Sequence, residues 1–126
     1  MEISNDIQMP IFMQVSEKLT DAIFTGAFAE ETQIPSTTEI SMTYKINPAT
    51  VLKGMNLLVD QGLIYKRRGV GMFVKQGARE RIKTMRNEDF SEKFIKPLLD
   101  EAKKLDLSAE DLHKLIDKEM SDEARA

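Results

Sequence analysis

The 126-residue sequence has no cysteine, one histidine and no apolar run of the roughly 20 residues that a membrane-spanning helix needs. The absence of cysteine excludes disulfides and is typical of a reducing compartment. One histidine gives no His-rich cluster for a metal, and the scattered carboxylates form no evident catalytic pair, so we expect no metal, no cofactor and no enzyme active site. The N-terminus lacks the basic-then-apolar order of a signal peptide, so we expect a cytoplasmic protein without membrane association.

Positive charge is not in excess either, because 18 Lys and Arg residues face 21 Asp and Glu residues. The net charge of −3 argues against a basic nucleic-acid-binding surface over the whole chain. However, Lys66, Arg67, Arg68 and Lys75 cluster in a segment that has no acidic residue between positions 61 and 77. We therefore expect a local basic patch and a modest total affinity for DNA.

The first part of the sequence predicts two helices in succession. Apolar residues recur at helical spacing from position 10, and Gly26 stands where a left-handed residue ends a helix. Ser36 and Glu39 have the spacing of a capping box for a short second helix, which ends in a turn at residues 45–47.

A third helix is predicted from Pro48 to about residue 61, with Asn47 as its N-cap. Ile46 and Val51 occupy the positions of a hydrophobic staple. We expect the core side of this helix to consist of Val51, Leu52, Met55, Leu58 and Val59. The outward side is expected to carry Ala49, Thr50, Lys53 and Asn56.

A β-hairpin is predicted after the third helix. Residues 63–66 and 72–75 are β-like, and Gly69 and Gly71 allow the positive φ of the loop between them. Three helices followed by a two-stranded ribbon predict a winged helix-turn-helix, a mainly helical fold with one small hairpin, over residues 1–77.

Residues 78–126 are expected to form a two-helix dimerisation tail. Pro97 either kinks the first tail helix or marks the first turn of a helix that starts near residue 96. Ser108 and Asp111 resemble a capping box for the last helix. Because two helices bury too little surface alone, a second copy of the chain is the expected partner. The expected dimer interface consists of Phe90, Phe94, Leu98, Leu99, Ala102, Leu105, Leu112, Leu115 and Ile116.

A set of short motifs covers roughly residues 8–76. They are Pro10-Ile11-Phe12-x-Gln14-Val15, Ile23-x-x-Gly26, Ile34-Pro35-Ser36-x-x-Glu39-Ile40, Asn47-Pro48-x-Thr50-Val51, Gln61-Gly62-Leu63-Ile64 and Arg68-Gly69-x-Gly71-x-Phe73-Val74. In this order and spacing they resemble the DNA-binding domain of GntR-type bacterial transcription regulators. The Asn-Pro-x-Thr-Val motif and the short tail look like the small YtrA-like subgroup. That resemblance implies dimerisation through two C-terminal helices, no large effector-binding domain, and repression of operons that encode ABC transporters.

The sequence also departs from the pattern of that family. Most members have arginines, which read bases or hold phosphates, where this chain has Thr38, Pro48 and Leu52. The glycine that often precedes the Ile-Pro-Ser motif is replaced by Glu31. The resemblance therefore implies no particular operator sequence.

DNA contact is expected from the helix-turn-helix and from the wing. A basic wing tip with glycines suits the narrow minor groove, although the same turn could simply be solvated. The third helix suits the major groove, with base readout by Thr37, Thr38, Ala49 and Lys53, where a threonine or alanine methyl group senses thymine. Thr50 could instead be a capping hydroxyl, and Lys53 an ordinary surface lysine. The expected contacts are Ser36, Thr37, Thr38, Lys45, Asn47, Ala49, Thr50, Lys53, Arg67, Arg68, Gly69 and Gly71.

The sequence thus predicts a homodimeric repressor whose two third helices meet adjacent turns of palindromic double-stranded DNA. The alternative is a winged-helix protein-interaction module, whose basic hairpin docks an acidic partner without DNA. The stripe at Phe90, Phe94 and Leu98 either packs in the dimer interface or lines a cleft for a small-molecule effector.

Overall fold

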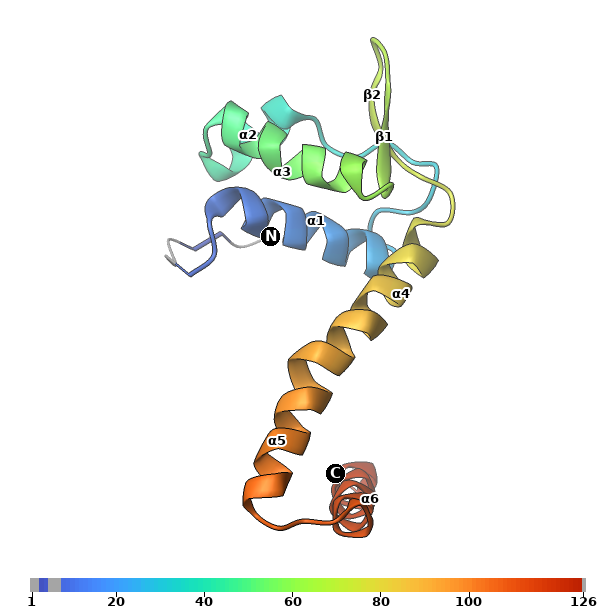
Figure 1. The fold of residues 1–126 in the computed structure, drawn as a ribbon. Helices are drawn as coiled ribbons and strands as arrows, with labels where there is room; N and C mark the ends of the chain where they lie inside the picture. Colours follow the sequence, from blue (N-terminus) through green and yellow to red (C-terminus); the bar gives the residue numbers. More distant parts are fainter. Residues whose placement is uncertain (1–2, 5–7, 126) are drawn as a thin grey trace. The chain divides into compact units, whose positions relative to one another are not determined.

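The computed structural model describes residues 3–4 and 8–125, which form two compact units, Met1–Met85 and Arg86–Ala126 (Figure 1). The first unit contains α1 (Ile11–Thr25), α2 (Thr37–Tyr44), α3 (Pro48–Asp60), β1 (Ile64–Arg67), β2 (Gly71–Val74) and the start of α4 (Ala78–Phe90). The second contains the end of α4, the π-helical turn η1 (Ser91–Ile95), α5 (Lys96–Lys104) and α6 (Ala109–Arg125). The predicted winged helix-turn-helix is confirmed. Within the described ranges, no helix is both long and apolar enough to span a bilayer.

The boundary between the two units lies inside α4, eight residues beyond the end of the domain predicted from the sequence. The side chains of Ala78 and Ile82 are buried in the core of the first unit, so α4 begins as part of that core. As a division between a DNA-binding and a dimerisation part, the limit after residue 77 stays a prediction.

The core of the first unit forms where α1 packs along α3. A glycine allows these two helices to approach closely. A Cβ atom at Gly54 would lie 2.6 Å from the carbonyl oxygen of Phe12 and 3.1 Å from the Cβ of Val15. The other core side chains are Leu19, Ile23, Ile34, Ile40, Ile46, Val51, Met55, Leu58, Leu63, Ile64 and Val74.

The expected core side of α3 is partly wrong. Val51, Met55 and Leu58 are buried, but Leu52 is 47% exposed and Val59 is 38% exposed. The buried residues recur at helical spacing with Gly54, so the side of α3 that faces α1 is centred on the glycine. Leu52 and Val59 consequently fall on the opposite, solvent-facing side.

The helix caps follow the predicted pattern. The amide of Glu39 donates to Ser36 Oγ at 3.0 Å, and the Glu39 carboxylate accepts from the Ser36 amide, which completes the capping box of α2. Asn47 Oδ1 accepts from the amide of Ala49 at 2.8 Å, and Pro48 occupies the first turn of α3. Gly26 ends α1 in the left-handed conformation, with φ 87°.

The two strands pair antiparallel, with Ile64 opposite Val74 and Arg67 opposite Gly71. β2 is also paired on its other side, which the sequence did not reveal. The amide of Ile34 donates to the carbonyl of Met72 at 2.9 Å, and the amide of Val74 donates to the carbonyl of Thr32 at 3.0 Å. Residues 31–34, between α1 and α2, thus pair with β2 on the side opposite β1 and support the wing.

In the second unit, α4, η1 and α5 follow one another without an intervening loop. Pro97 lies in the first turn of α5, so the second of the two alternatives for this proline is confirmed. Proline has no N–H to donate. The preceding backbone widens into a π turn, in which the amide of Lys96 donates to the carbonyl of Ser91.

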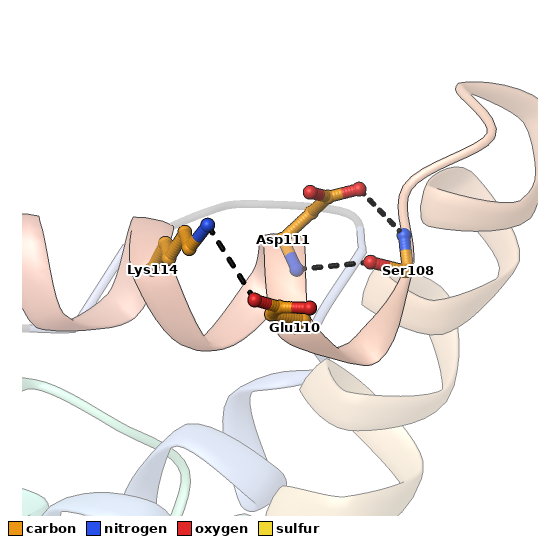
Figure 2. A network of polar contacts seen from close by, with 4 residues as sticks. All are labelled: Ser108, Glu110, Asp111 and Lys114. Atoms are coloured by element: carbon orange, nitrogen blue, oxygen red, sulfur yellow. Dashed lines mark hydrogen bonds and ion pairs between the residues drawn. The ribbon is translucent and has the colours of Figure 1, made fainter.

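The start of α6 is fixed by the second predicted capping box (Figure 2). The amide of Ser108 donates to Asp111 Oδ2 at 2.9 Å, and the amide of Asp111 donates to Ser108 Oγ at 3.1 Å. The bond from the Ser108 amide stabilises the Asp111 carboxylate and lowers the pKa of Asp111. Glu110 and Lys114 form an ion pair one turn apart at 3.6 Å.

Replacing Gly54 by valine is expected to reduce the free energy of unfolding by about 1–3 kcal/mol, because the new side chain collides with the backbone of α1. Urea denaturation followed by circular dichroism measures this change. Asn56→Val places the same side chain on the exposed side of α3 and serves as the control. Equal stability of the two variants would contradict the close packing of α1 and α3.

Candidate nucleic-acid interface

Two of the residues expected to contact DNA, Ser36 and Asn47, have capping roles in the structure. Asn47 accepts from the amide of Ala49 through its side chain and from the amide of Thr50 through its carbonyl, at 3.0 Å. These bonds satisfy amides at the start of α3, so a phosphate would have to compete for them. Direct DNA contact by Ser36 and Asn47 stays a prediction.

Two of the four expected base readers are engaged within the protein. The hydroxyl of Thr37 donates to Met55 Sδ at 3.3 Å, in a partly buried contact. The ammonium of Lys53 lies 4.0 Å from the centre of the Phe12 ring, as in a cation–π interaction. Thr38 and Ala49 are exposed, and Thr50 is half-buried. Lys53 therefore has a structural contact in α1, which its position in the sequence did not indicate.

The outer surface of α3 carries a stripe of exposed residues, of which only Ala49 was expected to contact DNA. Ala49, Leu52, Asn56 and Val59 are exposed and recur three or four positions apart, so they line one side of the helix. We call these four residues the α3 stripe. The outward position of Asn56 was correctly expected, but the exposure of Leu52 and Val59 depends on Gly54, whose packing partner is not evident from the sequence.

The wing presents its basic residues unequally. The Arg67 guanidinium lies over the Phe73 ring, 4.5 Å from the centroid, and so contributes to the packing of the hairpin. Arg68 is exposed, and no described residue forms a hydrogen bond or ion pair with it. Outside the wing, Lys45 is also exposed, and it is the residue in the left-handed conformation that ends α2. Gly69 has φ 77° and Gly71 has φ 145°, so both glycines have the positive φ that the loop was expected to need.

Gln33 braces the tip of the wing. Its side-chain amide donates to the carbonyl of Val70 at 2.9 Å, and a Cβ atom at Gly71 would collide with that amide. Gly71 is therefore required by its backbone conformation, and a larger residue there would also displace the flexible Gln33 side chain from Val70. The sequence does not reveal this contact, because Gln33 lies 37 positions before Val70.

The hairpin and α3 are open to solvent on the same side of the first unit. In Figure 1 the hairpin extends past α3 on the side away from α1. The α3 stripe also faces away from α1, since Gly54 faces towards it. The stripe and the wing are therefore both accessible from the side of the first unit that lies away from α1.

Two acidic residues after α1 hold the base of the wing. Glu30 accepts from the amides of Gly77, at 2.8 Å, and Arg79, at 3.2 Å, and so caps α4 from a distance. These bonds lower the pKa of the Glu30 carboxyl. Glu31 accepts from the Tyr65 hydroxyl at 2.8 Å and from the amide of Gln76 at 3.2 Å, and its bond to the hydroxyl raises the pKa of Tyr65.

The first turns of α4 make further contacts with the rest of the first unit. Arg81 donates through its Nε to the carbonyl of Gln61, at the end of α3. The Arg79 guanidinium lies 5.9 Å from the centre of the Phe24 ring. The start of α4 is thereby attached to α3, to α1 and to the segment that braces the wing.

The expected dimer interface is a largely exposed apolar surface of the second unit. Ala102 is only 5% exposed, and Leu112 is half-buried, whereas Phe94 is 61% exposed. The remaining expected interface residues, Phe90, Leu98, Leu99, Leu105, Leu115 and Ile116, are all exposed, and so are Ile95 and Met120. Between α5 and α6 this surface forms a groove of about 560 Å³, lined by Leu98, Leu105, Leu112, Leu115, Ile116 and Met120 among others. Part of the expected set thus packs within one chain.

The helix-turn-helix and the wing match a known protein family. Residues 13–74 match the family described as "Bacterial regulatory proteins, gntR family", over the helix-turn-helix and the wing. The chain belongs to the GntR family. The repressor NagR of Bacillus subtilis is 32% identical over 76 residues, which cover 60% of this chain and 31% of NagR. The chain spans less than a third of the length of NagR and of two other curated relatives, YurK of Bacillus subtilis and the histidine utilization repressor of Klebsiella aerogenes.

Solved structures extend the comparison of the fold. A protein of Bacteroides thetaiotaomicron, described as a GntR-family transcriptional regulator, is 28% identical, with a TM-score of 0.78 over 90% of this chain and 99% of that one. The DNA-binding domain of AraR, solved in complex with an operator, is 28% identical, with a TM-score of 0.52 over 59% of this chain and 89% of that one. YtrA of Sulfolobus acidocaldarius shares the fold at 23% identity, with a TM-score of 0.58 over 97% of each chain. These relatives are transcription regulators and not enzymes.

Replacing Glu30 by glutamine tests the hydrogen bonds that the Glu30 carboxylate accepts from the amides of Gly77 and Arg79. A carboxyl with a lowered pKa stabilises the folded state at pH values above its ordinary pKa of 4.5, and this contribution is lost as the pH falls through the lowered value. We therefore expect Glu30→Gln to be less stable than wild type at pH 7, with a difference that shrinks below about pH 4.5. Urea denaturation at pH 7, 5 and 3 measures the difference. A difference in stability that does not change with pH would contradict the role of the ionised Glu30 carboxylate.

Proposed function

We propose that the protein is a homodimeric transcriptional repressor that binds palindromic operator DNA, with α3 in the major groove and the wing in the minor groove. The observation that carries this proposal is that the α3 stripe and the hairpin, whose loop contains the exposed Arg68, both lie on the side of the first unit away from α1. The operator complex of the related AraR domain supports it.

The charge distribution favours DNA over an acidic protein as the partner of the wing. Lys66 and Arg68 are exposed near a tip that contains Gly69, and glycine lets the backbone approach a surface closely. The negative potential of a narrow minor groove attracts an arginine placed in this way. In the proposed complex Lys45, Thr38 and Ala49 face the same duplex, while Arg67 supports the hairpin through Phe73.

Homodimerisation is the part of the proposal that the second unit supports. Its apolar side chains remain exposed within one chain, and a contiguous apolar surface of this kind marks an interaction site. A two-fold dimer buries the same surface on both copies. It also presents two α3 helices to neighbouring turns of the duplex.

The remaining parts of the proposal rest on similarity. Repression is inferred from relatives such as NagR, which is named a repressor. Membership of the YtrA-like subgroup is supported by the shared fold and comparable extent of YtrA. Regulation of a transporter-type operon and a cytoplasmic location follow from that membership and from the expectations drawn from the sequence.

Replacing Arg68 by alanine is expected to weaken DNA binding and to reduce the salt dependence of the binding constant, because about one phosphate-neutralising contact per subunit is lost. Mobility shifts with the DNA upstream of the protein's own gene, at several salt concentrations, measure both effects. Arg125→Ala, which removes an exposed arginine at the end of α6, is the control. Wild-type binding by Arg68→Ala would contradict the role of the wing, and no sequence-specific binding by the unaltered protein would favour the protein-interaction module.

Replacing Phe94 or Leu98 by aspartate is expected to yield monomers, because a charge in a buried apolar interface is costly. Sedimentation velocity measures the oligomeric state. Ser121→Asp adds the same charge on the side of α6 away from the groove and should leave the dimer intact. A dimer that survives both substitutions would show that the apolar surface of the second unit is not the interface.

A further inference from the structure

We propose that α3 reads adenine–thymine base pairs, with Asn56 on adenine and with Ala49 and Leu52 against thymine methyl groups. This inference rests on the proposed function, since it assigns a base preference to the surface of α3 that would face DNA. It adds a specificity-determining residue, Asn56, which was expected on the outward side of the helix but not among the DNA contacts.

The first observation is the composition of the α3 stripe. Ala49, Leu52, Asn56 and Val59 face away from the core contact at Gly54, and Asn56 is the one member with a polar side chain. Its amide has no hydrogen-bond partner among the described residues. An amide flanked by apolar side chains is thus available to an external partner.

The second observation is that α3 presents no arginine, and no lysine without a partner, that could read guanine. The helix contains no arginine, and its one lysine, Lys53, has its ammonium 4.0 Å from the centre of the Phe12 ring. The Thr37 hydroxyl, at the start of α2, is engaged by Met55 Sδ. Guanine is usually read by a bidentate arginine or lysine, so recognition of guanine by this helix lacks its usual donor.

The chemistry of the base edges fits the side chains that remain. In the major groove adenine presents one acceptor, N7, and one donor, the N6 amino group, and an asparagine amide complements both at once. Guanine presents two acceptors there, which leaves the asparagine oxygen without a donor. Thymine adds a methyl group, and the exposed Leu52 and Ala49 provide an apolar surface for it.

The test begins with selection of duplexes from a random pool by the full chain. The wild-type protein should enrich sites with an adenine–thymine pair at a fixed position in each half-site. Asn56→Ala should reduce discrimination at that position by about ten- to a hundred-fold, as expected for the loss of a bidentate contact. Asn87→Ala, which removes an exposed asparagine from α4, should leave the discrimination unchanged.

Modified bases separate the two kinds of contact. Replacement of adenine by 7-deazaadenine at the selected position removes the N7 acceptor and should weaken binding by wild type but not by Asn56→Ala. Replacement of the neighbouring thymine by uracil removes the methyl group and should weaken binding by wild type but not by Leu52→Ala.

The outcomes distinguish the inference from the proposed function. If the wild-type protein enriches no duplex, the proposed function fails and the base assignment falls with it. If it enriches duplexes that carry guanine–cytosine pairs at the positions protected by α3, or if Asn56→Ala keeps the wild-type preference, the base assignment is wrong while the proposed function stands.

Discussion

The close contact between α1 and α3 at Gly54 is the constraint on which the candidate interface depends. No side chain larger than hydrogen fits there, because a Cβ atom would lie 2.6 Å from the carbonyl oxygen of Phe12. The contact fixes the rotation of α3 about its own axis. It turns Leu52 and Asn56 towards solvent, and it brings Lys53 close enough to α1 for its ammonium to pack on the Phe12 ring. One glycine thus determines which side chains α3 presents to a partner.

A second constraint comes from the segment between α1 and α2. Gln33 holds the tip of the wing through Val70, while Glu30 and Glu31 bind the backbone that leads from β2 into α4. The wing is therefore held along its length and does not depend on its own two strands alone. A two-stranded hairpin is only marginally stable without such support. The same segment restrains the start of α4, so that helix and wing share their anchoring contacts.

The sequence predicted those parts of the fold that depend on local interactions. The capping boxes at Ser36 and Ser108, the N-cap at Asn47 and the left-handed Gly26 lie where local patterns placed them. Contacts between distant segments were not predictable in the same way. The hydrogen bond from Gln33 to Val70 joins residues 37 positions apart. The exposure of Leu52 depends on which face of α3 packs against α1, and hydrophobic periodicity alone did not show which face that is.

The candidate interface carries little positive charge, which makes the proposed dimerisation important for its affinity for DNA. Lys66 and Arg68 are exposed on the wing, but Arg67 packs on Phe73 and Lys53 packs on Phe12. In the proposed complex one subunit would therefore neutralise few phosphates, and its gain from counterion release would be correspondingly small. A dimer doubles these contacts and makes the second binding event intramolecular, which raises the affinity without any new type of contact. The exposed apolar surface of the second unit and the sparse charges of the first therefore support the proposal that dimerisation raises the affinity for DNA while the α3 stripe determines which bases are read.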